Sequence, residues 1–104
     1  MLINCAWISD PKTFLRYAIE VVREFLSEDL IERYEKVLEE SDLMLVLRKS
    51  LELFCNPHLY GKKLVVVLDE FHSFIEKMAY RIARETKKKK AVVKSDILWL
   101  LRDI

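Results

Sequence analysis

Apolar positions recur at helical spacing along most of the chain. Asp10-Pro11 predicts a helix start, because an N-cap type residue precedes proline at the first helical position. Ser27 predicts the start of a second helix, and Ser41-Asp42 the start of the next. That last helix is expected to end at Asn56-Pro57, since a residue before proline avoids the helical region. The pattern therefore predicts one or two N-terminal helices followed by a short helix.

The longest predicted helix spans about residues 63–86. Its apolar positions step by three or four residues and form a wide stripe: Leu64, Val67, Leu68, Phe71, Ile75, Met78, Ala79 and Ile82. Ala91-Val92-Val93 predicts a short extended segment, and a last helix is expected to start near Ser95-Asp96. The second part of the chain thus predicts a short helix, a long helix and a short helix joined by loops.

Composition agrees with an all-α fold. The 104 residues suit one small domain, and 52% of them are hydrophobic. One glycine and two prolines are too few turn residues for a β-sandwich or barrel of this size. Two cysteines, Cys5 and Cys55, form no disulfide framework and favour a reducing compartment. The apolar start MLINCAWI is too short for a signal peptide, and we expect no membrane span.

Charge is distributed unevenly along the chain. Residues 1–40 hold 5 basic and 9 acidic side chains, a net of −4, whereas residues 41–104 hold 13 and 8, a net of +5. The total of +1 does not indicate a nucleic-acid-binding protein. Six lysines are nevertheless candidate DNA contacts, with weak binding expected: Lys62, Lys63, Lys87, Lys88, Lys89 and Lys90. The simpler interpretation of the last four is a solvated helix end, where cations suit the exposed carbonyls.

The wide apolar stripe of the long helix needs cover on two sides. Short flanking helices cover one side, and exposing the other to water would be unfavourable at about 25 cal/mol per Å². A partner chain is one way to cover it. The predicted partner interface is Leu47, Phe54, Leu68, Phe71, Ile75, Met78, Ile82, Ile97, Leu98 and Leu101. The alternative is an intramolecular core, in which residues 11–40 fold back over the stripe.

The end of the chain resembles a known family. Val93 and Asp96 match the start of the last helix in histone folds, and DILWLLR matches that helix in histone-fold TBP-associated factors, most closely the TFIID subunit 13 family. Asn56-Pro57 and Leu68-Asp-Glu match the same family. The resemblance covers residues 42–102, although Phe54-Cys55 stands where the family has Gly-Asp or similar acidic residues.

The resemblance implies a fold and a function. It implies a histone-fold domain over residues 42–104, preceded by an acidic helical extension over residues 1–41. It implies a nuclear scaffold of RNA polymerase II initiation in a TFIID-like or SAGA-type complex. The partner would be a TFIID subunit 11-like histone-fold chain, with TBP contacted indirectly and no cofactor. It also implies a structural pair between Lys89 and Asp96.

Two other functions are compatible with the residues. One is a histone-like DNA-binding homodimer, and the other is a self-contained helical bundle that acts as a protein-interaction module. Cys55, His58 and His72 lack the second half of a zinc pattern, so we expect no metal. Asp69-Glu70 with His72 could be read as catalytic, but no Gly-rich loop or nucleophile motif accompanies them. We therefore expect no enzymatic activity.

Overall fold

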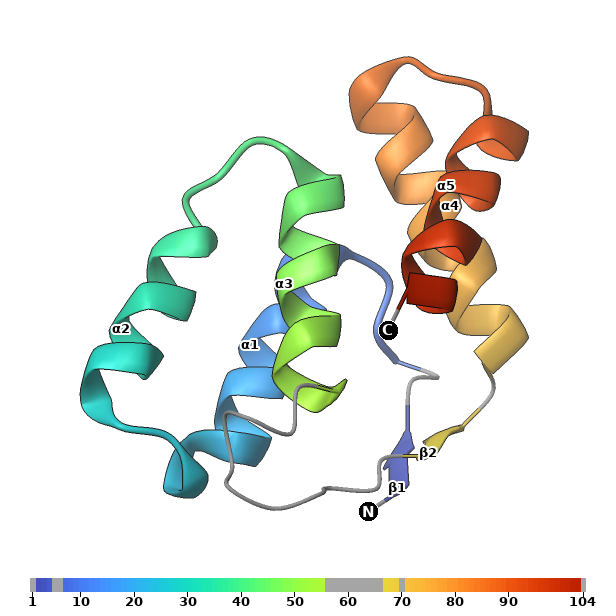
Figure 1. Ribbon diagram of the computed structural model, residues 1–104. Helices are drawn as coiled ribbons and strands as arrows, with labels where there is room; N and C mark the ends of the chain where they lie inside the picture. Colours follow the sequence, from blue (N-terminus) through green and yellow to red (C-terminus); the bar gives the residue numbers. More distant parts are fainter. Residues whose placement is uncertain (1, 5–6, 56–66, 70, 104) are drawn as a thin grey trace.

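The computed structural model describes residues 2–4, 7–55, 67–69 and 71–103 (Figure 1). Side chains are described for residues 7–53 and 72–102. Within these ranges the elements are β1 (Leu2–Asn4), α1 (Pro11–Val22), the 3-10 helix η1 (Arg23–Phe25), α2 (Glu28–Val37), α3 (Leu43–Cys55), β2 (Val67–Asp69), α4 (Phe71–Thr86) and α5 (Lys90–Asp103). Helices build the body of the molecule, which confirms the helical class. The two short strands were not predicted.

Side-chain caps start the first three helices where the sequence predicted them. Asp10 accepts hydrogen bonds from the Thr13 N–H at 2.9 Å and the Thr13 hydroxyl at 2.7 Å, and Pro11 begins α1. The Ser27 hydroxyl accepts a bond from the third residue of α2, and the Asp42 carboxylate accepts two from the first turn of α3. These bonds satisfy N–H groups that have no partner inside a helix.

Two helices form the main packing of the first part of the molecule. α1 lies along α3, with α2 beside them (Figure 1). The face of α1 that is buried consists of Pro11, Phe14, Leu15, Ala18, Ile19 and Val22. From α2, only Ile31 is fully buried, so α2 covers the edge of this layer and leaves most of its own surface in water.

The long helix predicted over residues 63–86 is shorter than expected. Residues 67–69 form β2, and α4 begins at Phe71, so the prediction was wrong for the described residues before 71. Val65-Val66-Val67 is β-branched, which favours a strand over a helix. A continuous apolar run of this length is compatible with either structure, and pairing with β1 decides between them.

The predicted extended segment at Ala91-Val92-Val93 is helical instead. α4 ends at Thr86, and the next residue, Lys87, has a φ of 59°, the left-handed conformation that follows many helices. α5 then begins at Lys90, five residues earlier than expected, and the Lys89 carbonyl accepts bonds from the Val92 and Val93 N–H groups. Val93 is buried against the core, so packing outweighs its weak helix preference.

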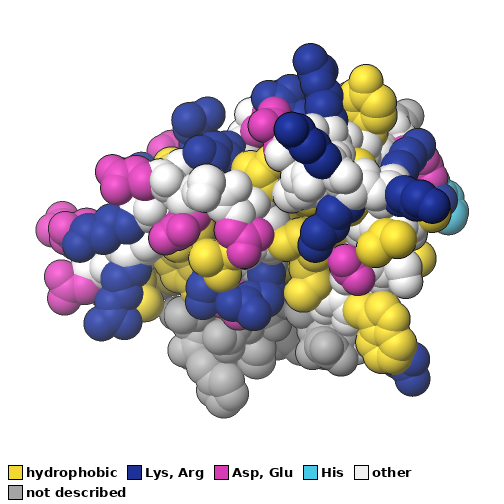
Figure 2. All heavy atoms as spheres, turned by 90° about the horizontal axis from the view of Figure 1, so that it is seen from above, with side chains coloured by type: hydrophobic (Ala, Val, Ile, Leu, Met, Phe, Trp, Pro, Cys, Tyr) yellow, Lys and Arg dark blue, Asp and Glu magenta, His cyan; other side chains and the backbone are white. Residues whose placement is uncertain are grey.

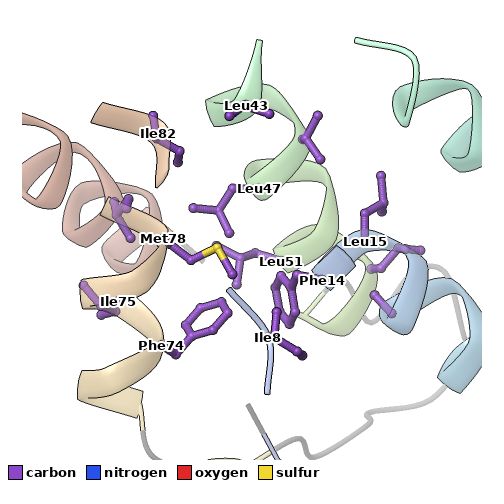
Figure 3. Close-up of a cluster of buried hydrophobic side chains, with 14 of the residues drawn as sticks. Ile8, Phe14, Leu15, Leu43, Leu47, Leu51, Phe74, Ile75, Met78 and Ile82 are labelled. Carbon is purple, nitrogen blue, oxygen red and sulfur yellow. The ribbon is translucent and has the colours of Figure 1, made fainter. Parts of the chain in front are cut away.

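One hydrophobic core spans the chain between α1, α3, α4 and α5. Phe74 and Met78 of α4 point toward Leu47 and Leu51 of α3 (Figure 3). The Phe14 and Phe74 rings pack edge to face with their centroids 4.8 Å apart, and this contact connects α1 with α4. Both the predicted extension (residues 1–41) and the predicted histone-fold domain (residues 42–104) contribute buried residues to this one core.

The short–long–short helix arrangement of a histone fold is not confirmed. α3, α4 and α5 have similar lengths of 13, 16 and 14 residues. α3 packs chiefly on α1, and α4 packs chiefly on α5 (Figure 1). The helical class is therefore shown, and the histone fold stays a prediction.

Candidate functional site

The two strands lie side by side and run parallel. Leu2 pairs with Val67, Ile3 with Leu68 and Asn4 with Asp69. Parallel strands require a long crossover, and here the segment that carries α1, α2 and α3 supplies it. Both strands therefore end at the same edge, with the polar residues Asn4 and Asp69 next to one another in register.

This carboxyl edge combines two features that favour ligand binding. Asp69 ends β2, and α4 begins two residues later at Phe71. The first N–H groups of a helix lack intrahelical partners and carry a partial positive charge, which favours anions. Carboxylate and amide oxygens are ligands for hard divalent cations. The edge thus brings Asn4 of β1 into register with Asp69 of β2, two residues before α4 begins.

The sides of the two strands, as well as their ends, bear on the stability of this strand pair. A pair of three-residue strands is marginal by itself, and parallel sheets occur almost exclusively where helices cover both faces. Figure 1 shows the pair at the end of the molecule, near the lower ends of α1 and α4. Each strand also has a second side that no other described strand pairs with.

A charged cluster braces α4 against α5. Glu76 of α4 contacts Lys90 at 2.5 Å and also pairs with Lys94, one turn further along α5. Hydrogen bonds from Lys90 and then Lys94 lower the pKa of Glu76 to about 2, from an ordinary value of 4.5. The Glu76 side chain remains 41% exposed, so the cluster is a surface network.

The predicted partner interface divides into three groups. Leu47, Ile75, Met78, Ile82 and Ile97 lie buried in the core of the single chain. Leu98 is exposed and Leu101 is half-buried on α5. The side chains of Phe54, Leu68 and Phe71 lie outside the described residues. α1, α3 and α4 contribute to one core, in which Phe14 of α1 contacts Phe74 of α4, and the partner interface stays a prediction.

The lysines predicted as DNA contacts also divide. Lys87, Lys88 and Lys89 are exposed in the turn between α4 and α5, whereas Lys90 pairs with Glu76. Lys62 and Lys63 lie outside the described residues.

The predicted structural pair between Lys89 and Asp96 is corrected by the position of α5. No ion pair joins these two residues, both of which the structure describes. Because α5 starts at Lys90, Asp96 lies almost two helical turns beyond Lys89, about 10 Å along the axis. Glu76 takes the bracing role that was assigned to Asp96.

Sequence reasoning named Asp69-Glu70 but placed the pair on a helix. The signal for the strand was the run Leu64–Leu68, five apolar residues directly before two acids. Of the other candidates, His72 is exposed on α4, and Cys55 and His58 have no described side chain. Among described residues, no group of three histidine, cysteine or acidic side chains could hold a metal ion.

Comparison of the chain with protein-family models, curated proteins and solved structures finds no match. Across the described helices, none is long and apolar enough to cross a membrane.

Proposed function

We propose that the carboxyl edge of the two parallel strands of this chain binds a phosphorylated ligand with a divalent cation. The observation that carries the proposal is the parallel register that brings Asn4 beside Asp69. In open α/β sheets, ligands bind outside the carboxyl ends of the strands.

The chemistry of the edge indicates the ligand. Magnesium is usually held by one or two carboxylates together with the phosphates of a substrate. An apolar strand that ends in aspartate is also how phosphate-loop NTPases present the acid that holds Mg²⁺. Asp69 has this position, and Glu70 follows it in the sequence. We therefore propose a nucleoside di- or triphosphate as the ligand class.

The chain by itself supplies only part of such a site. Its one glycine, Gly61, excludes a Gly-rich phosphate loop within residues 1–104. The proposal is therefore binding, with weak affinity for the isolated chain, and includes no catalytic step. The expectation of no enzymatic activity stays a prediction.

Paramagnetic broadening by Mn²⁺ tests the proposal, because it locates weak binding. Amide signals of Asn4 and Asp69 should broaden first, and adding a nucleoside triphosphate should strengthen the effect. Asp69→Asn should abolish this local broadening, and the control Asp29→Asn, an exposed acid of α2, should not. Broadening that is centred on α2, or that survives Asp69→Asn, would contradict the proposed site.

A TFIID-like histone-fold subunit is a second candidate. Val92, Leu98 and Trp99 of α5 are each about half exposed or more, which leaves apolar surface for a partner chain. A handshake over the α4 stripe would require α4 to leave α1 and α3, since Ile75, Met78 and Ile82 are buried there. Co-expression with a subunit 11-like chain distinguishes the two. A stable complex in which Phe14 becomes exposed would favour the histone fold, whereas a soluble monomer would favour the closed core.

A further inference from the structure

The outward face of α4 and the turn after it are strongly basic. Residues 76–94 hold eight basic and two acidic side chains, a formal net charge of +6, while the whole chain carries +1. Seen from above, dark blue side chains are spread over this face of the molecule, with magenta ones between them (Figure 2). The charge imbalance of the chain is therefore concentrated on one end of one helical hairpin.

The two acids in this region are already neutralised. Glu76 pairs with Lys90 and Lys94, and Glu85 pairs with Arg81 at 3.7 Å. After these pairings, four exposed cations have no ion-pair partner among the residues described: Arg84, Lys87, Lys88 and Lys89. Their positive field is not compensated locally, so this surface favours an anionic partner.

The turn holds three of these cations in a defined place. Lys87 directly follows α4 in the left-handed conformation, and the Lys89 carbonyl accepts hydrogen bonds from the Val92 and Val93 N–H groups in the first turn of α5. The Glu76 network joins the two helices on either side of the turn. The lysines are thus presented by a braced helical hairpin, which limits the backbone entropy that a partner would have to remove.

An exposed aromatic ring lies on the same face. Tyr80 is 60% exposed, and Arg84 follows it four residues later in α4. This spacing places Tyr80 and Arg84 on one stripe of the helix, and Lys87–Lys89 follow in the turn directly after α4. A ring next to cations provides a stacking surface beside phosphate contacts.

We propose that the surface formed by Tyr80, Arg84 and Lys87–Lys89 binds single-stranded nucleic acid. The cations would contact successive phosphates, and the tyrosine would stack on a base without sequence preference. A duplex keeps its bases stacked on one another and offers no face to the ring. The combination of ring and cations therefore favours a single strand. This surface does not include the carboxyl edge of β1 and β2, so each of the two proposed sites can be tested without the other.

Fluorescence anisotropy with a labelled oligothymidylate of about 16 nucleotides tests this surface. Four phosphate contacts predict a slope of about −3 in a plot of log affinity against log salt. The triple variant Lys87→Gln, Lys88→Gln, Lys89→Gln should make that slope shallower by about 2 and weaken binding at low salt at least tenfold.

A matched control separates this surface from net charge. Arg16, Arg33 and Lys36 are exposed on α1 and α2, and replacing all three by Gln removes the same charge. That control should keep the slope within about one unit of the wild-type value. An equal loss in both triple variants would overturn the proposal, because only net charge would then matter. Far-ultraviolet circular dichroism of each variant checks that the fold is retained.

The ring provides a second, independent readout. Tyr80→Ala should weaken single-strand binding about tenfold with the salt slope unchanged, and Tyr80→Phe should restore the affinity. If Tyr80→Ala has no effect, or if duplex DNA or anionic phospholipid vesicles bind as tightly as the single strand, the single-strand proposal is overturned.

Discussion

The α1–α3 layer and the α4–α5 hairpin are built from the same kind of helix but present opposite surfaces. Residues 7–55 hold seven basic and eleven acidic side chains, a net of −4, whereas residues 71–103 hold nine and four, a net of +5. Ion pairs in the first region are mostly local, between residues three or four apart, such as Lys36 with Glu32. In the second, Glu76 links two different helices.

This difference shows which ion pairs act within one helix and which join two helices. Local pairs at this spacing support one helix and contribute only a few tenths of a kcal/mol. The Glu76 cluster fixes the orientation of α5 on α4, although its exposure limits what it adds to stability. The two regions are then joined by apolar contacts between α1, α3 and α4.

The largest expected effect comes from breaking the contact between the two regions. Phe74→Ala removes a buried ring that meets Phe14 at 4.8 Å and should lower the free energy of unfolding by about 3–5 kcal/mol. Urea denaturation measures it, with Leu98→Ala on the exposed face of α5 as the control. A Phe74→Ala variant as stable as this control would show that the contact between Phe74 and Phe14 does not hold the two regions together.

The cap of α1 tests the acidic region alone. Asp10→Ala removes two hydrogen bonds to Thr13 and should cost about 1–2 kcal/mol. Ser27→Ala removes a longer, exposed bond of 3.3 Å at α2 and should cost less, about 0.5–1 kcal/mol. Thermal unfolding of both variants gives the ranking, and the reverse order would mean that α2, not α1, anchors this layer.

The turn of the basic region tests backbone strain. Lys87 has a φ of 59°, which glycine adopts without the steric conflict of a Cβ atom. Lys87→Gly should therefore stabilise the protein by about 0.5–1 kcal/mol. Lys88→Gly, at the next position, serves as the control and should not be stabilising. Chemical denaturation distinguishes these results, and a destabilised Lys87→Gly would contradict the strained geometry.

The smallest expected effect is the pH dependence of the hairpin brace. The pKa of Glu76 is lowered in the folded state, so its stabilising contribution is complete above its ordinary value of 4.5 and is lost as pH falls toward about 2. The melting temperature declines between pH 5 and pH 2 partly because Glu76 loses its charge. Glu76→Gln should remove this part of the decline. Glu24→Gln, an exposed acid of η1, should follow the wild-type curve, and identical curves for all three proteins would refute the brace.

The candidate site was only partly predictable. Asp69-Glu70 could be noticed as an acidic pair, but its position depended on whether residues 64–68 form a helix or a strand. The apolar run is short enough for both, and β1 lies more than sixty residues away in the chain. Likewise, Tyr80 and Arg84 could be placed on one helix face, whereas the pairing of Glu76 with Lys90 and Lys94 required the turn at Lys87.

The sequence by itself determined the helical class, the starts of α1, α2 and α3, and the uneven charge, because caps and periodicity act within a few residues. Only the tertiary structure decided which surfaces meet. It placed residues of α1, α3, α4 and α5 in one core, turned Val67–Asp69 into a strand beside β1, and made Ala91-Val92-Val93 helical. Each of these outcomes depends on contacts between distant segments, whose burial and hydrogen bonding outweigh local preference.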